Sequence, residues 1–198
     1  MTTIMGIDRL RMGTDGKGVT TLVAFYGCPL SCRYCLNPQC HEIPVDESLP
    51  TPEQLCAELA KDNLYFRMTE GGVTFGGGEP LLQSAYIATF AKLAPAEWKL
   101  RIETSLYVPW EHIEPLTERV DQWIIDIKDA EDEIYFRYTD CHNALVKENV
   151  RRLAELVGPE KLHIRVPHIP GYNTSEDVER SVAFYEKYGE VEVFEYLL

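Results

Sequence analysis

Residues 25–37 read Phe25-Tyr26-Gly27-Cys28-Pro29-Leu30-Ser31-Cys32-Arg33-Tyr34-Cys35-Leu36-Asn37, a C-x3-C-x2-C pattern directly after an apolar, β-prone run. Structural zinc usually takes four protein ligands, and a cubane iron–sulfur cluster normally takes four cysteines for its four irons. Three thiolates leave one iron free to bind another molecule. The pattern therefore predicts a cluster that takes part in chemistry, held in the loop that follows a strand.

Two other interpretations of the three cysteines stay open at this stage. Cysteine often packs as a small buried hydrophobe, and a zinc site could take Cys40 or His41 as its fourth ligand. A disulfide framework is disfavoured, because the first residues, 1–6, have no basic segment leading into an apolar secretory core.

The composition is that of an ordinary globular protein, with 45% hydrophobic and 26% charged residues. A length of 198 residues fits a single domain over residues 1–198. No apolar run approaches the roughly 20 residues that cross a bilayer. The net charge of -13 argues against nucleic acid as a partner, since phosphate binding needs clustered lysine and arginine. Thiols without a secretion signal indicate a reducing compartment, the cytoplasm.

Short β-prone runs alternate with stretches of helical apolar spacing. The expected strands are Val19–Tyr26, Val73–Phe75, Lys99–Glu103, Gln122–Asp126, His163–Val166 and Val191–Tyr196. A capping box with proline at the first helical position, Thr51-Pro52-Glu53-Gln54, starts one helix. Further helices are expected over Ala85–Leu93, Glu111–Val120, Asn143–Val157 and Ser175–Tyr188.

Six strands alternating with helices predict an α/β fold with right-handed crossovers and a parallel sheet. Strand count does not separate an open doubly wound sheet from a partial barrel, but both bind ligands at the carboxyl ends of the strands. Most of the polar or reactive candidates fall there: the cysteine loop, Gly76–Glu79, Glu103-Thr104, Asp126 and Lys128. Arg165 lies on the fifth strand.

A second motif, Gly76-Gly77-Gly78-Glu79-Pro80, follows the second expected strand. Glycines let the backbone approach a ligand closely. The spacing is neither the dinucleotide-binding G-x-G-x-x-G nor a P-loop. Taken alone, the motif fits an ordinary turn before a helix equally well.

Together the two motifs resemble the radical S-adenosylmethionine (SAM) superfamily, whose signature is C-x3-C-x-aromatic-C followed by Gly-Gly-Glu-Pro. Here the aromatic residue is Tyr34 and the loop is Gly77-Gly78-Glu79-Pro80. Within that superfamily the chain is most similar to the activating enzymes of glycyl-radical enzymes, of the pyruvate formate-lyase activating type. The stretches that carry this similarity are Met12–Gly18, Gly72–Phe75, Asp126–Lys128 and Ile164–Asn173.

The resemblance implies a partial (β/α)6 TIM-like barrel with its active site at the carboxyl strand ends. It implies that Cys28, Cys32 and Cys35 ligate a [4Fe-4S] cluster whose fourth iron binds SAM. One electron from the cluster would then cleave SAM, and the resulting 5′-deoxyadenosyl radical would abstract a hydrogen atom. Cofactors carry such chemistry while the protein positions them, so no side chain is assigned as an acid or base.

The resemblance also implies roles in holding SAM. Gly77, Gly78 and Glu79 would accept hydrogen bonds from its ammonium group. Lys128 and Arg165 would face its carboxylate or ribose side, and Tyr34 would lie near the adenine.

A monovalent cation beside the sulfonium is a further expectation, with oxygen ligands from Glu103, Thr104 and Asp126. The family pattern at the first of these positions is Asp-Thr-Asn, whereas this chain has Glu103-Thr104-Ser105. Gly76 also replaces the serine that commonly precedes Gly-Gly-Glu-Pro. The remaining cysteines, Cys40, Cys56 and Cys141, are too scattered to build an additional cluster.

The leading functional expectation is an oxidoreductase that installs a glycyl radical on a partner enzyme and is reduced by flavodoxin or ferredoxin. One alternative is a radical SAM enzyme that modifies a small molecule or a peptide. Another is a non-catalytic iron–sulfur or zinc protein, which a closed site using Cys40 would favour.

Overall fold

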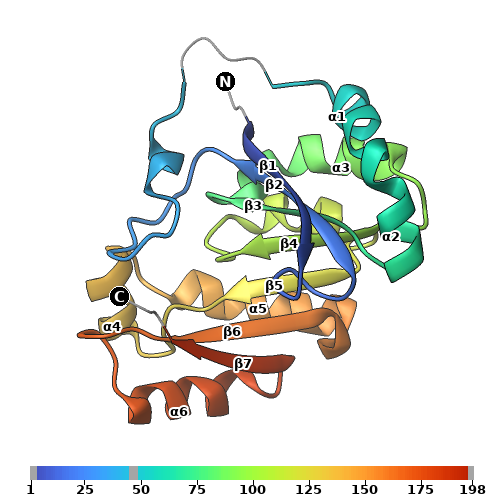
Figure 1. Cartoon of the computed structure of the whole chain (residues 1–198). Helices are drawn as coiled ribbons and strands as arrows, with labels where there is room; N and C mark the ends of the chain where they lie inside the picture. The colour runs from blue at the N-terminus through green and yellow to red at the C-terminus, as the bar shows by residue number, and fades with distance from the viewer. Residues whose placement is uncertain (1–3, 45–48, 196–198) are drawn as a thin grey trace.

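The computed structural model describes residues 4–44 and 49–195, and it contains a seven-stranded sheet in the order β1 to β7 (Figure 1). Strands β2 to β7 run parallel to their neighbours, and β1 pairs antiparallel with β2. The strands are β1 (Ile4–Met12), β2 (Val19–Phe25), β3 (Gly72–Gly77), β4 (Lys99–Thr104), β5 (Gln122–Asp126), β6 (Leu162–His168) and β7 (Glu190–Glu195).

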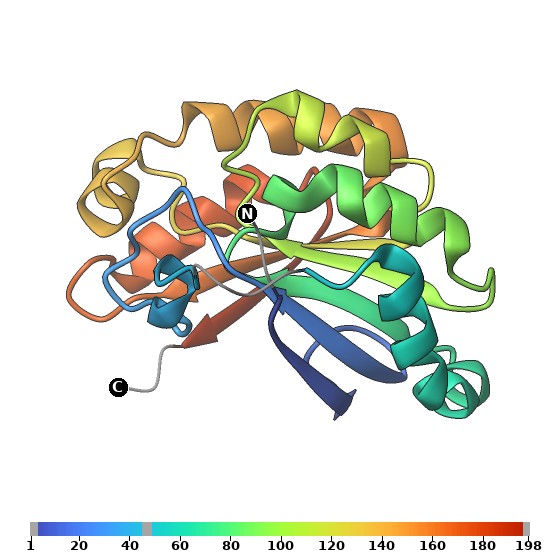
Figure 2. The ribbon, with the colours of Figure 1, turned by 90° about the horizontal axis from the view of Figure 1, so that it is seen from above.

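The prediction of six parallel strands is confirmed, with β1 as an additional edge strand that the sequence analysis missed. Within the described ranges the two outer strands, β1 and β7, do not pair with each other, so the sheet is open. The last expected strand extended to Tyr196, which lies outside the described residues. Figure 2 shows the helices gathered over one face of the curved sheet.

The helices are α1 (Pro52–Leu59), α2 (Asn63–Thr69), α3 (Ser84–Leu93), α4 (Asp132–Thr139), α5 (Ala144–Val157) and α6 (Ser175–Tyr185). The predicted capping box is confirmed: the Thr51 hydroxyl accepts from the Gln54 amide, and the Gln54 side chain accepts from the Thr51 amide. Thr174 and Asp177 cap α6 in the same way. The sequence analysis predicted neither α2 nor α4.

The helix expected over Glu111–Val120 does not form. The chain makes two short 3-10 turns there, Trp110–His112 and Glu114–Leu116. Pro115 lacks an amide hydrogen, and its ring would clash with the carbonyl of Glu111 in a continuous α-helix. The connection between β4 and β5 therefore has no α-helix.

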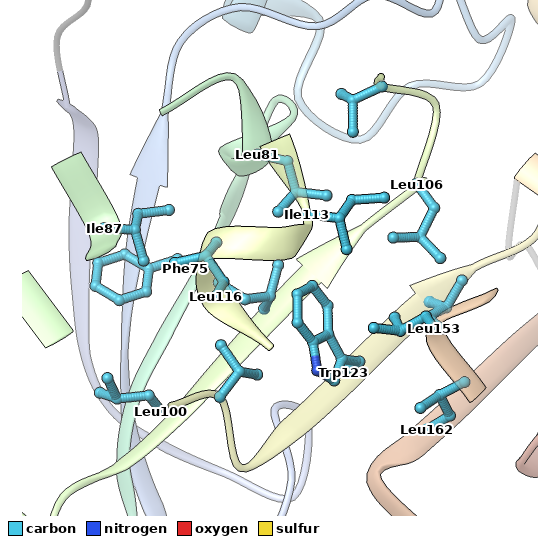
Figure 3. Packing of buried hydrophobic residues seen from close by; sticks show 14 of the residues in the cluster. Phe75, Leu81, Ile87, Leu100, Leu106, Ile113, Leu116, Trp123, Leu153 and Leu162 are labelled. Carbon is cyan, nitrogen blue, oxygen red and sulfur yellow. The ribbon is translucent and has the colours of Figure 1, made fainter. Parts of the chain in front are cut away.

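One face of the sheet packs against the helices and forms the hydrophobic core (Figure 3). Trp123 is fully buried there, with Phe75, Leu116 and Leu153 in the same cluster. Successive residues of a strand point to opposite faces. Trp123 and Ile125 face the core, so Asp126 faces the other, concave side of the sheet.

The loop between β1 and β2 lies over the concave face. Arg165 on β6 donates a hydrogen bond to the carbonyl of Thr14, and Arg101 on β4 donates to the carbonyl of Lys17 at 2.7 Å. Two buried or half-buried guanidinium groups thus hold this loop against the middle of the sheet. Among helices in the described part of the chain, none is both long and apolar enough to span a membrane.

Candidate functional site

A cavity of about 580 Å³ lies at the carboxyl end of the parallel strands. All of the site residues predicted from the sequence line it, and they come from the ends of five strands and the loops that follow. These residues are Cys28, Cys32, Tyr34, Cys35, Gly77, Gly78, Glu79, Glu103, Thr104, Asp126, Lys128 and Arg165. Its size is in the usual range for a site that encloses a small molecule.

The cysteine loop leaves β2 and docks against the carboxyl end of α4 (Figure 1). The Ser31 amide donates to the carbonyl of Thr139 at 3.2 Å, and the Arg33 amide donates to the carbonyl of Tyr138 at 3.1 Å. Arg33 also forms a 2.7 Å ion pair with Asp140. These contacts attach the cysteine loop to α4, which lies more than a hundred residues further along the chain. They therefore fix the position of the loop that carries the three thiols.

The three predicted ligand thiols are half-buried. Burial is the main factor that raises the pKa of Cys28 to about 12, and it also raises the pKa of Cys32. Metal binding would replace these thiol protons, because thiolates are the form that binds metal. In the described ranges, no three His, Cys, Asp or Glu side chains converge as a single ion requires.

The glycine loop after β3 packs directly against the start of the cysteine loop. The Gly78 amide donates to the carbonyl of Phe25 at 2.9 Å, and the Glu79 amide donates to that of Gly27 at 2.7 Å. From the far side of the cysteines, the Asn37 side-chain amide donates to the carbonyl of Gly77 at 3.2 Å. The two sequence motifs therefore form one hydrogen-bonded unit.

Glu79 is 1% exposed, and its carboxylate accepts four hydrogen bonds from within the chain. Oε1 accepts from the Thr104 hydroxyl at 2.6 Å and from the Leu81 amide at 3.2 Å. Oε2 accepts from the Ser105 hydroxyl at 2.7 Å and from the Ser105 amide at 3.0 Å. Burial raises the pKa of Glu79, while these donors act to lower it. The side chain links the glycine loop to the end of β4.

Tyr34 belongs to a cluster of three tyrosine rings. Its ring meets Tyr172 edge-on at a centroid distance of 5.7 Å and Tyr138 at 6.2 Å, and those two rings are 5.1 Å apart. Edge-to-face contacts at these distances are favourable. The cluster joins the cysteine loop to α4 and to the segment that precedes α6.

Charged side chains on β4, β5 and β6, and Lys128 just after β5, form the floor of the cavity. Arg165 Nη1 lies 2.7 Å from Glu103 Oε1 and 3.8 Å from Asp126 Oδ1. Lys128 Nζ lies 3.9 Å from Asp126 Oδ2. Burial and the neighbouring Asp126 raise the pKa of Glu103 to about 7, against the opposing effect of Arg165. In this arrangement Arg165 is paired with Glu103.

The three residues expected to bind a cation are placed side by side but differ in their contacts. The Thr104 hydroxyl donates to Glu79 and accepts from the Leu106 amide at 2.9 Å, so both of its roles are used within the chain. Asp126 Oδ1 is buried and accepts no hydrogen bond. Of these three residues, Asp126 thus has the side-chain oxygen best suited to an added ligand.

Two of the departures from the family pattern, Gly76 and Glu103, are neighbours on β3 and β4. A Cβ added at Gly76 would lie 3.2 Å from Glu103 Oε2 and 3.2 Å from a methyl group of Leu22. The missing side chain at one position thus leaves room for the longer side chain at the other.

A double-mutant cycle tests this match. We expect Gly76→Ala to be tolerated better when Glu103 is also changed to Asp, with a coupling free energy of about 0.5–1 kcal/mol, because neighbouring side chains are not additive. Urea unfolding of the four proteins measures it. Additive effects would show that Gly76 and Glu103 are independent.

The sequence analysis missed several residues that organise the cavity. Ser105 was noted only as a departure, yet it gives Glu79 two of its four hydrogen bonds. The Asn37 side-chain amide donates to the carbonyl of Gly77, and the main-chain carbonyl of Thr14 accepts from Arg165. The available signal was position: Ser105 directly follows Thr104, and Asn37 comes two residues after Cys35.

An open parallel sheet with thiols, a glycine loop and paired charges at its carboxyl edge defines an α/β protein that holds a ligand in that cavity. The chain belongs to the radical SAM superfamily, because residues 22–184 match the model described as "Radical SAM superfamily". The pyruvate formate-lyase-activating enzyme of Staphylococcus aureus is 30% identical over 195 residues, covering 94% of this chain and 77% of that relative. The isethionate sulfite-lyase activating enzyme of Oleidesulfovibrio alaskensis is 26% identical over 230 residues, covering 85% and 74%.

Solved structures agree in fold. Streptococcus suis SuiB bound to S-adenosylmethionine matches with a TM-score of 0.65 and 18% identity, covering 87% of this chain and 39% of SuiB. Native anSMEcpe with bound AdoMet matches with a TM-score of 0.57 and 16% identity, covering 86% and 49%. This chain therefore spans less than half of either structure. The predicted family and the partial-barrel fold are confirmed.

The cofactors of the superfamily are a [4Fe-4S] cluster and SAM, and the cavity fits both. It presents three thiols for iron. It also holds a buried carboxylate oxygen without a hydrogen-bond donor, and the cations Lys128 and Arg165 beside it. These groups can complement the charged ends of an amino acid.

Proposed function

We propose that this radical SAM enzyme is an activase that generates a glycyl radical on a partner enzyme. The observation that carries the proposal is the similarity to activating enzymes over most of the chain, 94% for the relative from Staphylococcus aureus. The (2S)-3-sulfopropanediol dehydratase activating enzyme of Klebsiella oxytoca is also similar, with 26% identity over 80% of this chain. These relatives differ in the enzyme they activate, so the class of partner is proposed and its identity is left open.

In this proposal Cys28, Cys32 and Cys35 hold the cluster. When bound, the cluster and SAM supply the electron transfer and the hydrogen-atom abstraction. The chain binds and orients them: carbonyls of Gly77 and Gly78 accept from the SAM ammonium, and Glu79 fixes the loop that presents those carbonyls. This assigns Glu79 to positioning, because its own acceptor sites are filled.

The charged floor would orient the rest of SAM. Lys128 stands beside Asp126 and can face the SAM carboxylate. Arg165 forms an ion pair with Glu103 and donates to the Thr14 carbonyl. It would therefore contact SAM while it stays bound to these two partners. Tyr34 lines one side of the cavity together with the tyrosine cluster, and the adenine would lie against that side.

A protein substrate needs access to the cavity. The sheet is open between β1 and β7 within the described ranges. Leu36, which lines the cavity next to Cys35, is 78% exposed. A large exposed apolar side chain at the cavity rim suits contact with a partner. A reductant of the flavodoxin or ferredoxin type is part of the same proposal.

The experiment reconstitutes the cluster without oxygen, adds SAM and a reductant, and measures 5′-deoxyadenosine by mass spectrometry. We expect product from the wild type and background levels from Cys32→Ala, because one ligand is lost. The matched control is Cys56→Ala, which removes a half-buried thiol that contacts Leu93 outside the cavity and should leave the product unchanged.

The partner is tested by adding purified glycyl-radical enzymes to the same mixture. A glycyl radical signal by electron paramagnetic resonance is the expected result with one of them. Product formation without a radical on any glycyl-radical enzyme, but with a modified peptide or small molecule, would replace the activase proposal by another radical SAM reaction. An intact zinc protein that never takes up a cluster would overturn both.

A further inference from the structure

Asp129 is a buried carboxylate that directly follows Lys128 in the chain but does not itself line the cavity. It is 1% exposed. Its Oδ1 accepts from the Glu131 amide at 2.8 Å and from the Ser181 hydroxyl at 3.4 Å. Its Oδ2 accepts from the side-chain amide of Asn173 at 3.1 Å. One side chain therefore joins the loop after β5, the turn after β6, and α6.

Asn173 holds the turn after β6 closed. It is 6% exposed, and its Nδ2 donates to the carbonyl of Pro167 at 2.9 Å as well as to Asp129. Its Oδ1 accepts from the Ile169 amide at 2.6 Å. The Ile169 carbonyl accepts from the amides of Tyr172 and Asn173 at 3.0 and 3.2 Å. These bonds give the turn one defined shape, and the bond to Asp129 fixes it against the loop after β5.

The turn places Tyr172 beside the wall of the cavity. The Tyr172 ring lies 5.7 Å from the ring of Tyr34, which lines the cavity, and the Tyr172 carbonyl accepts from Arg137 of α4 at 2.7 Å. Tyr138 is fully buried and contacts both of the other rings. A packed cluster has little free space, so a shift of the turn would move Tyr34 as well.

We propose that Asp129 and Asn173 are positioning residues for the adenosine part of SAM. Their hydrogen bond fixes the turn after β6, the turn fixes Tyr172, and Tyr172 supports Tyr34 at the wall of the cavity. The inference rests on the proposed placement of the adenine against that wall. Neither Asp129 nor Asn173 contacts SAM in this assignment.

An ionised carboxylate suits this position because it only accepts hydrogen bonds. In Asp129→Asn the remaining carbonyl oxygen can still accept from the Glu131 amide, so the loop that carries Lys128 keeps that bond. The new NH2 group would face the NH2 group of Asn173, and two donors cannot bond to each other. The substitution therefore releases the turn and leaves the loop after β5 in place.

The test compares two ligands by equilibrium dialysis against iron-loaded protein without oxygen. SAM is one ligand, and the other is S-methylmethionine, which has the sulfonium, ammonium and carboxylate groups but no adenosine. We expect Asp129→Asn to weaken SAM binding about tenfold, in the range seen when a group that orients a binding site is lost. Binding of S-methylmethionine should stay at the wild-type level. A general structural defect would weaken both ligands or neither.

Exchanging the two side chains provides a rescue. In Asn173→Asp a second carboxylate would face Asp129, so SAM binding should fall at least as far as in Asp129→Asn. In the double variant, Asp129→Asn with Asn173→Asp, the amide and the carboxylate trade places and can bond again. We expect the double variant to bind SAM more tightly than Asn173→Asp alone.

Two further variants keep the test independent of folding defects. Tyr172→Leu removes the supporting ring and leaves Asp129 and Asn173 unchanged, so it should show the same selective loss of SAM binding. Asp62→Asn is the matched control. Asp62 is another buried carboxylate, 5% exposed, and it bonds to Arg9 and Thr21, none of which lines the cavity. It should lower the free energy of unfolding in urea without changing the ratio of the two affinities.

The proposal is overturned if folded Asp129→Asn or Tyr172→Leu binds SAM as tightly as the wild type, or if both ligands lose affinity equally. Failure of the proposed function is a separate result. The wild type would then bind SAM but form no glycyl radical on any partner, whatever the ratio of the two affinities in the variants.

Discussion

Replacing Glu79 by alanine should weaken SAM binding by about 10–100-fold, the range seen when a group that orients a binding site is lost. The carboxylate is 1% exposed and satisfies four donors, two of them main-chain amides. Without it, the amides of Leu81 and Ser105 lose an acceptor inside the protein. A buried unpaired donor costs about 1–3 kcal/mol, so the glycine loop and the end of β4 should separate or admit water.

The measurement has two parts: SAM affinity by equilibrium dialysis without oxygen, and the free energy of unfolding in urea. Glu79→Gln is the matched control, because its size is kept and its amide oxygen can still accept from Thr104 and Leu81. Its NH2 group would face the donors of Ser105, so we expect an intermediate loss. Wild-type SAM affinity in a folded Glu79→Ala protein would show that the carboxylate does not position the loop.

The sequence could predict which segments build the site because each chemistry-bearing motif sits at the end of a strand. The cysteine run follows β2 and the glycine run follows β3, and parallel strands bring their carboxyl ends to one edge. Asp126 closes β5 in the same way. Motif spacing and the direction of the strands were therefore enough to predict that residues from distant parts of the chain line one cavity.

Side-chain pairing within that cavity could not be predicted from the same signals. The motif predicts Glu79 as a ligand for SAM. Its hydrogen bonds to Thr104 and Ser105 instead depend on the register between β3 and β4. The sequence predicts Arg165 as a cation that faces SAM. Its ion pair with Glu103 joins β6 to β4 and could not be predicted from either strand alone. Such contacts follow from tertiary geometry.

Local patterns also failed where charge or proline interrupted them. β1 carries Asp8, Arg9 and Arg11 on an edge strand, so its alternation is largely polar and gave no strand signal. Arg11 is engaged with Asp15, which is 1% exposed, in the loop that covers the concave face. The stretch around Pro115 had helical spacing of apolar residues, but the proline prevents the helix.

The second large effect is expected from Gly78→Ala, because the glycine loop and the cysteine loop touch at this residue. A Cβ on Gly78 would lie 2.1 Å from the carbonyl oxygen of Gly27 and 3.2 Å from that of Phe25. Both obstacles are backbone atoms, so no side chain can rotate away. The two loops must move apart, which would break the 2.7 Å bond from the Glu79 amide to Gly27.

Gly78→Ala should therefore destabilise the protein by about 3 kcal/mol, the upper part of the range for overpacking. It should also reduce iron uptake, because Gly27 immediately precedes Cys28 and the displaced loop carries all three predicted cluster ligands. Urea unfolding and iron content after reconstitution measure the two effects. Gly6→Ala is the control: a Cβ there meets nothing within 4 Å, so stability and iron content should match the wild type. A Gly78→Ala protein as stable and as iron-rich as that control would mean that the two loops are not in contact, and that the cysteine loop alone defines the cluster site.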